Sequence, residues 1–125
     1  MRVLLRALII TNAALFFFGA LQHAGLAIGQ FHEPHILPAS IVEALCGIAL
    51  ACGATALIAR ARTSWGVALT ANAVAIAGVV LGMIALAAGR GPRTASNDLY
   101  HRIMLALSSV SLLILLFRRS ALSRK

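Results

Sequence analysis

The stretch WGVALTANAVAIAGVVLGMIALAAG, residues 65–89, contains no charged side chain. A transmembrane α-helix needs ~20 largely apolar residues, because each residue rises ~1.5 Å and the hydrocarbon core is ~30 Å thick. Three other runs meet this requirement, at about residues 4–28, 38–59 and 99–117. The sequence therefore predicts an all-α integral membrane protein, a four-helix bundle forming a single transmembrane domain over residues 1–125.

Composition agrees with this prediction, since 61% of the chain is hydrophobic and only 11% is charged. A soluble domain of this length would expose large apolar patches to water. The first run follows Arg2 and Arg6, as in a secretory signal peptide, but it is longer than the usual ~7–15 apolar residues of such a segment. We therefore expect it to stay as the first helix, with the lipid bilayer as the main partner of all four.

Basic residues gather at one set of helix ends, which predicts the orientation of the bundle. Under the positive-inside rule, both termini are cytoplasmic. Anionic lipid head groups are the expected partners of the inner arginines. Nucleic-acid binding is not expected, because no soluble domain carries the charge. The inner set is Arg2, Arg6, Arg60, Arg62, Arg118, Arg119, Arg124 and Lys125, and the outer set is Arg90, Arg93 and Arg102.

All the acids and histidines of the chain map to the outer half of this topology. They are Glu33, Glu43, Asp98, His23, His32, His35 and His101. Counting ~1.5 Å per residue puts His23 ~28 Å along the first helix and Glu43 ~8 Å inside the second. His101 lies near the outer end of the fourth. The sequence thus predicts one outer layer that contains these three side chains.

Glu43 is the strongest member of this layer. An ionisable group inside a span normally faces protein or a water-filled cavity and has a partner. We expect Glu43 to be buried and paired with His23 or His101, in a ligand-binding pocket. The third run has no ionisable side chain before Arg90, so we expect the pocket to open away from that helix.

The other polar residues of the outer half allow two interpretations each. Asp98, three residues before His101, shares its helix face and joins the predicted ligand site, or it helps to cap the fourth helix. His32, Glu33 and His35 surround Pro34 in a short loop. They form a lid or supply metal ligands, or they are simply solvated.

The first helix has an inward stripe at spacings of four, three and four residues: Asn12, Phe16, Gly19 and His23. Asn72 lies at a similar depth on the third helix, and we predict a structural Asn12–Asn72 hydrogen bond. Gly78 and Gly82 form a small-xxx-small motif that is typical of helix packing or dimerisation. Cys46 and Cys52 fall on different faces of the second helix, so no disulfide is expected.

The segments LFFFGALQHAGLA and PASIVEALCGIALACGATAL, with a glutamate early in a helix followed by Gly47 and Gly53, resemble the small four-helix DoxX-like bacterial membrane proteins. The resemblance covers mainly the first three helices. It implies location in the bacterial inner membrane and a link to quinone chemistry. It transfers no catalytic residue.

Three functional classes remain open. The chain is an accessory bundle with a membrane-protein or homo-oligomeric partner, or it binds a lipophilic quinone- or isoprenoid-like molecule in the outer polar pocket. The third class is a transition-metal protein, since imidazole and carboxylate suit Zn, Fe or Cu. Haem bound by His23 and His101 is disfavoured, because no second intramembrane histidine pair exists. No HExxH, CxxC or P-loop motif indicates an enzyme class.

Overall fold

A computed structural model describes residues 2–27, 34–60, 62–91 and 93–122 of the protein. These residues form four helices and no strand: α1 (Arg2–His23), α2 (Leu37–Ile58), α3 (Ser64–Ala87) and α4 (Ala95–Leu122). Each helix is long and apolar enough to cross a membrane. The prediction of an all-α, four-helix membrane fold is therefore confirmed.

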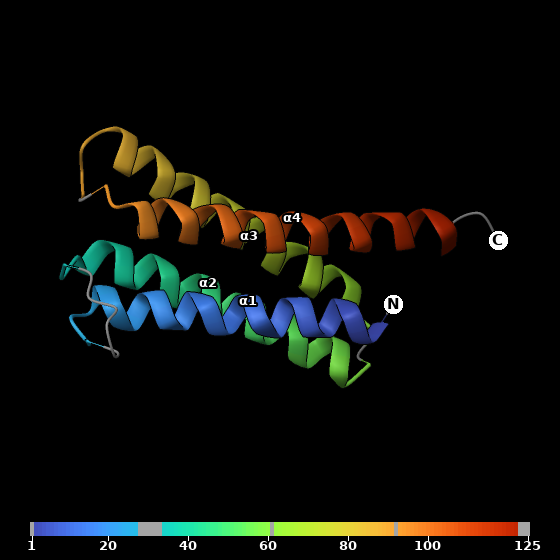
Figure 1. Cartoon of the computed structure of the whole chain (residues 1–125). Coiled ribbons are helices and arrows are strands. Elements are labelled where there is room, and N and C mark those ends of the chain that lie inside the picture. The colour runs from blue at the N-terminus through green and yellow to red at the C-terminus, as the bar shows by residue number, and fades with distance from the viewer. Residues whose placement is uncertain (1, 28–33, 61, 92, 123–125) are drawn as a thin grey trace.

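The start of α1 and the end of α4 lie at the same end of the bundle (Figure 1). We call this the terminal end, which also carries the α2–α3 connection, and we call the opposite end the loop end. Large apolar side chains on the outward faces are exposed, which suits a lipid-covered surface. Examples are Ile10, Leu45, Ile48, Ile84 and Leu113.

Two glycines end helices at the loop end earlier than the apolar runs predict. Gly25 has φ 95° and Gly89 has φ 73°, in the left-handed region that glycine adopts without strain. After α1, the Leu26 amide donates to the Leu21 carbonyl over 3.0 Å. After α3, the Arg90 amide donates to the Ala85 carbonyl, which is likewise five positions earlier. This is the Schellman arrangement. The predicted ends at residues 28 and 89 were too late.

The starts of α2 and α4 follow capping chemistry. Pro38 stands in the first turn of α2, where a missing amide hydrogen is tolerated. At α4, the Thr94 hydroxyl accepts from the Asn97 amide over 3.1 Å. This cap lets α4 begin at Ala95, four residues before its apolar run. The predicted start at residue 99 was therefore too late.

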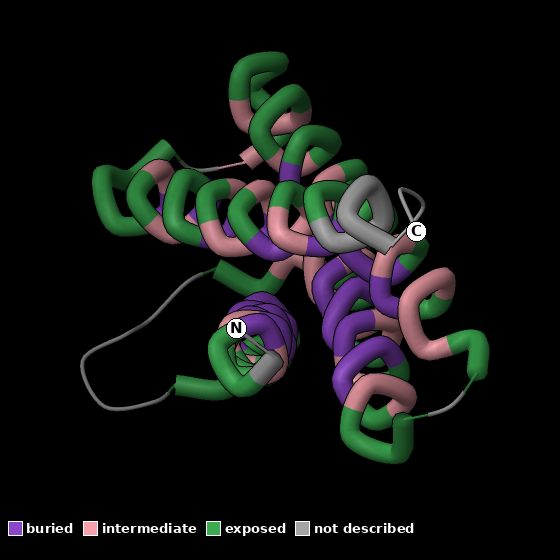
Figure 2. The backbone as a smooth tube through the Cα atoms, turned by 90° about the vertical axis from the view of Figure 1, so that its right-hand side faces the viewer, coloured by how far each residue is buried: buried purple, intermediate pink, exposed green. Residues whose placement is uncertain are grey.

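The helices form a ring in which α1 and α3 each pack against α2 and α4. Figure 2 shows the buried positions of the helices turned toward one another. Side-chain hydrogen bonds to backbone carbonyls fix the terminal end: Arg6 Nη2 donates to Leu57 O over 2.6 Å, and Trp65 Nε1 donates to Leu115 O over 3.0 Å. The first joins α1 to α2, and the second joins α3 to α4.

The inward stripe of α1 is confirmed, since Asn12, Phe16, Gly19 and His23 are all buried. The predicted Asn12–Asn72 hydrogen bond was wrong. Both amides are buried as expected, but Asn12 donates to Ser108 Oγ over 2.6 Å and Asn72 donates to Ala68 O over 2.8 Å. Ser108 lies on α4, the direct neighbour of α1, whereas α3 does not pack against α1.

Gly78 and Gly82 serve packing inside the bundle. A Cβ at Gly78 would collide with Cys46 Sγ of α2, and a Cβ at Gly82 would lie 2.7 Å from His101 Nε2 of α4. The glycines therefore let α3 approach both of its neighbours. Cys46 and Cys52 are free thiols, as predicted, with Cys46 buried and Cys52 exposed.

This packing predicts different effects for valine at two glycines of α3. Gly78→Val should lower the free energy of unfolding by about 1–3 kcal/mol, because overpacking moves α2 away from α3. Gly66→Val is the matched control, since a Cβ at Gly66 meets nothing within 4 Å. Unfolding in mixed micelles measures both. Equal destabilisation by the two variants would contradict the close approach at Gly78.

Candidate functional site

A cavity of about 330 Å³ lies in the loop-end half of the bundle. All four helices and the residues just after α3 contribute to its lining. Its polar members are His23, Glu43, Arg90, Asn97, Tyr100 and His101, and its apolar wall includes Phe16, Ile36, Val42, Val79, Leu81 and Leu86. His23, Glu43 and His101, which the sequence predicts in one layer, all line this cavity.

The centre of the site is a hydrogen-bonded pair from α1 and α2. His23 Nδ1 and Glu43 Oε2 are 2.8 Å apart, with side chains only 5% and 9% exposed. His23 is the last residue of α1, and its carbonyl accepts from the Ile36 amide just before α2. This hydrogen bond ties the residue before α2 to the last residue of α1, beside the pair. Glu43 is buried and partnered, as the sequence predicts.

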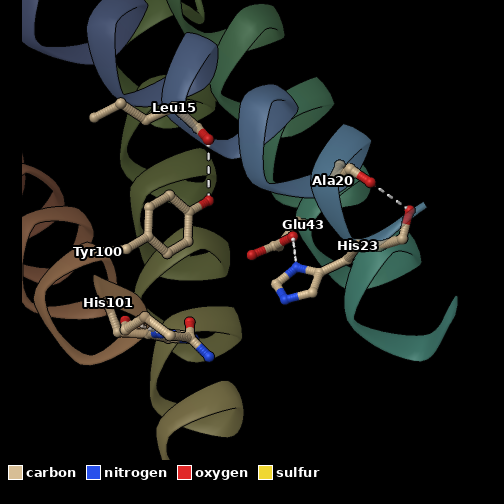
Figure 3. Close-up of polar contacts among 8 residues, drawn as sticks. Leu15, Ala20, His23, Glu43, Tyr100 and His101 are labelled. Carbon is tan, nitrogen blue, oxygen red and sulfur yellow. Dashed lines mark hydrogen bonds and ion pairs between the residues drawn. The ribbon is translucent and has the colours of Figure 1, made fainter. Parts of the chain in front are cut away.

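Tyr100 of α4 approaches the same pair from the other side (Figure 3). Its hydroxyl donates to the Leu15 carbonyl of α1 over 3.0 Å, and it lies beside the Glu43 carboxylate. Gly19 makes room for both groups. A Cβ there would collide with the Tyr100 hydroxyl and would lie 2.8 Å from Glu43 Oε1. Gly19 therefore gives the Tyr100 and Glu43 side chains space against α1.

His101 is oriented by its own helix. Its Nδ1 is 2.9 Å from the Asn97 carbonyl oxygen, which can only accept, so Nδ1 carries the hydrogen. Nε2 then lies on the Gly82 side of the cavity. In a neutral ring this nitrogen is an acceptor, and in a charged ring it is a donor. The tyrosine and histidine rings stand edge to face, with centroids 5.6 Å apart.

The expectation that the pocket opens away from the third helix was wrong. Six α3 residues line the cavity: Gly78, Val79, Leu81, Gly82, Ala85 and Leu86. Figure 1 shows α3 crossing the bundle obliquely, so that its loop-end half diverges from α1 and α2. The helix without ionisable groups therefore supplies the apolar wall of the site rather than leaving it.

Asp98 does not line the cavity. Its Oδ2 lies 3.5 Å from Arg93 Nε, and it stands in the first turn of α4, where a carboxylate suits the helix dipole. His35 is exposed, near Gly25. His32 and Glu33 lie outside the described residues. Within the described part of the chain, no three His, Cys, Asp or Glu side chains are grouped closely enough to hold a metal ion.

Sequence reasoning missed Tyr100. Tyr100 is the only tyrosine of the chain and precedes a predicted site residue, which was a usable signal. A buried tyrosine hydroxyl usually has a hydrogen-bond partner, so its position on a mostly apolar helix indicates an interior polar contact. The inward stripe predicted for the first helix includes Gly19, but the sequence did not indicate that Tyr100 and Glu43 would pack against it.

No protein family, curated protein or solved structure matches the chain. The resemblance to DoxX-like proteins therefore stays a prediction. The site has to be interpreted from its own chemistry.

The His23–Glu43 pair predicts strong coupling between the two positions. Removing one partner of a buried pair leaves an uncompensated polar group and costs about 3–5 kcal/mol. His23→Leu and Glu43→Leu should each be strongly destabilising, and the double variant should lose less stability than the two single losses combined. Unfolding of all four proteins in bicelles measures this coupling.

The control is a second double variant, in which Glu43→Leu is combined with Arg6→Leu. Arg6 also joins α1 to α2, but it bonds Leu57 O at the terminal end. The free-energy changes of substitutions at distant sites usually add within ~0.5 kcal/mol. If the losses in free energy of unfolding caused by His23→Leu and Glu43→Leu are also additive, the His23–Glu43 pair makes no net contribution to stability.

Proposed function

We propose that this multi-pass membrane protein binds a lipophilic small molecule, quinone- or isoprenoid-like, in the loop-end cavity. The supporting observation is the arrangement of that cavity. An apolar wall from α2 and α3 faces a polar side formed by the His23–Glu43 pair and by Tyr100 and His101. Ligand sites are typically apolar with a few placed polar groups.

The size of the cavity limits how much of the ligand it can hold. About 330 Å³ equals the volume of roughly ten water molecules, at ~30 Å³ each. It accommodates a polar head group and the first part of an apolar chain. The rest of such a chain would lie along the lipid-facing surface, where Leu81 and Ile84 of α3 are exposed.

The polar side orients the head group. Glu43 Oε2 is engaged by His23, and the Tyr100 hydroxyl is engaged by Leu15 O. The His101 ring is held through Nδ1, by the Asn97 carbonyl, so that Nε2 lies on the Gly82 side of the cavity. His101 is therefore the residue that we expect to bond the head group directly. His23, Glu43 and Tyr100 hold the surrounding helices in place.

We also propose that the loop end faces away from the cytoplasm of a bacterial inner membrane. Support comes from the excess of basic residues at the terminal end over the loop end. The head group would then be drawn from the outer leaflet.

Binding should depend on the free volume of the cavity. Ala85→Phe fills space at a lining position and should weaken binding at least tenfold, whereas Ala77→Phe, on the exposed face of α3, should leave binding unchanged. Mass spectrometry of lipids that co-purify with the protein identifies natural ligands. Equilibrium binding of a decyl-substituted benzoquinone and of geranylgeraniol in nanodiscs compares the variants.

His101→Phe keeps the ring volume but removes both nitrogens. We expect roughly a tenfold loss of affinity, since a hydrogen bond contributes about 0.5–1.5 kcal/mol and tenfold corresponds to about 1.4 kcal/mol. Absence of any co-purified lipophile, with no binding of either probe, would refute the ligand proposal and leave an accessory bundle.

Orientation has a separate test. In a background without Cys46 and Cys52, a single cysteine at Thr63 should be protected from a membrane-impermeant reagent added outside intact cells, and one at Thr94 should be labelled. Thr63 lies at the terminal end and Thr94 at the loop end. The reverse labelling pattern would invert the proposed topology.

A further inference from the structure

A second group of polar side chains lies in the middle of the bundle, separate from the cavity. Asn12, Asn72, Ser108 and Ser111 are each 0% exposed, and none of them lines the cavity. They come from α1, α3 and α4. Four buried polar residues among apolar helices need a physical explanation, because lipid offers no hydrogen bonds to their side chains.

Two contacts place three of these residues at one level. Asn12 Nδ2 donates to Ser108 Oγ over 2.6 Å, which joins α1 to α4. The Trp65–Leu115 hydrogen bond sets the register of α3 against antiparallel α4. Asn72 and Ser108 each lie seven residues from these two positions toward the loop end, ~10 Å at ~1.5 Å per residue, so the register brings them to similar levels.

The register is consistent at the other end of α3, where Gly82 faces His101 of α4. His101 lies seven residues before Ser108 on α4, and Gly82 lies ten residues after Asn72 on α3. These two spacings differ by less than one helical turn, so the two helices stay aligned to within one turn. Ser111 is one turn from Ser108 on the same face of α4. The three helices therefore bring the four side chains into one central layer.

Three atoms of this layer have no hydrogen-bond partner among the described residues. They are Asn12 Oδ1, Asn72 Oδ1 and Ser111 Oγ. Leaving such an atom buried and unpaired costs about 1–3 kcal/mol. The two amide oxygens can only accept, whereas the serine hydroxyl can donate. The layer thus presents two acceptors and one donor.

We propose that this layer is a binding site for a single water molecule that bridges α1, α3 and α4. Water has the complementary set of groups, since its two hydrogens reach Asn12 and Asn72 and its oxygen accepts from Ser111. Buried waters typically make ~3 hydrogen bonds to groups that otherwise lack partners.

A metal cation fits the layer less well. Sodium-like and calcium-like ions take ~6 oxygen ligands and are usually neutralised by carboxylates. The carboxylates of the described residues, Glu43 and Asp98, are both nearer the loop end. A neutral ligand matches a layer of amides and hydroxyls.

The bridge supplies a link that the helices themselves lack. In the described part of the chain, α1 and α3 do not pack against each other. A water held by both Asn12 and Asn72 connects these diagonal helices and fixes the rotation of α3. The inference does not depend on ligand binding in the cavity.

The asparagines allow a selective test, because the chain contains only Asn12, Asn72 and Asn97. In protein labelled with ¹⁵N-asparagine and placed in bilayers, water-edited solid-state NMR measures magnetisation transfer from water to each side-chain amide. We expect rapid transfer to Asn12 and Asn72. In Asn72→Leu, transfer to Asn12 should fall several-fold, whereas Asn97→Leu, at the loop end, should leave it unchanged.

Ser111→Ala serves as a milder variant if Asn72→Leu does not fold. It should slow transfer to both central amides, and Ser109→Ala on the neighbouring face should not. Slow transfer to Asn12 and Asn72 in the wild-type protein would overturn the proposal. So would transfer that persists unchanged in both central variants, or amide shifts that appear in sodium chloride but not in choline chloride, which would indicate a cation.

Discussion

This bundle depends on one constraint: polar groups of its helices must form hydrogen bonds with one another, because the surrounding lipid offers them none. Four helices with apolar surfaces gain little from the hydrophobic effect when they associate in lipid, because lipid tails are as apolar as their side chains. Their relative rotation is instead set by groups that must find partners. His23 with Glu43, Tyr100 with Leu15 O, and Asn12 with Ser108 each join two helices in this way.

Glycine makes these polar contacts sterically feasible. Gly19 admits the tyrosine hydroxyl and the glutamate carboxylate to the surface of α1, while Gly78 and Gly82 let α3 approach α2 and α4. The close approach at Gly78 lies near the middle of α3. Beyond it, α3 diverges from α1 and α2 toward the loop end, and the cavity occupies this region (Figure 1). Tight packing at one level and an open site at the next are thus parts of the same geometry.

The sequence predicted the features that follow from length and depth. Apolar runs located the four helices, and counting residues placed His23, Glu43 and His101 in one layer. Helix ends were predicted less well, because Gly25, Gly89 and Thr94 act through local backbone geometry that hydropathy does not contain. Partners across helices were harder still. Asn12 could have met Asn72 by depth alone, but the order of helices around the ring brought Ser108 beside it.

The order of the helices in the ring also determines how early each contact can form during synthesis. His23 and Glu43 are 20 positions apart within the first helical hairpin, so their hydrogen bond can form as soon as α1 and α2 have entered the membrane. Asn12 and Ser108 are 96 positions apart, and the amide of α1 has to wait for the last helix. The His23–Glu43 contact can therefore be completed within the first hairpin, before α3 and α4 follow. Asn12 stays without its native partner Ser108 until α4 arrives, so the last helix completes a central contact of the first.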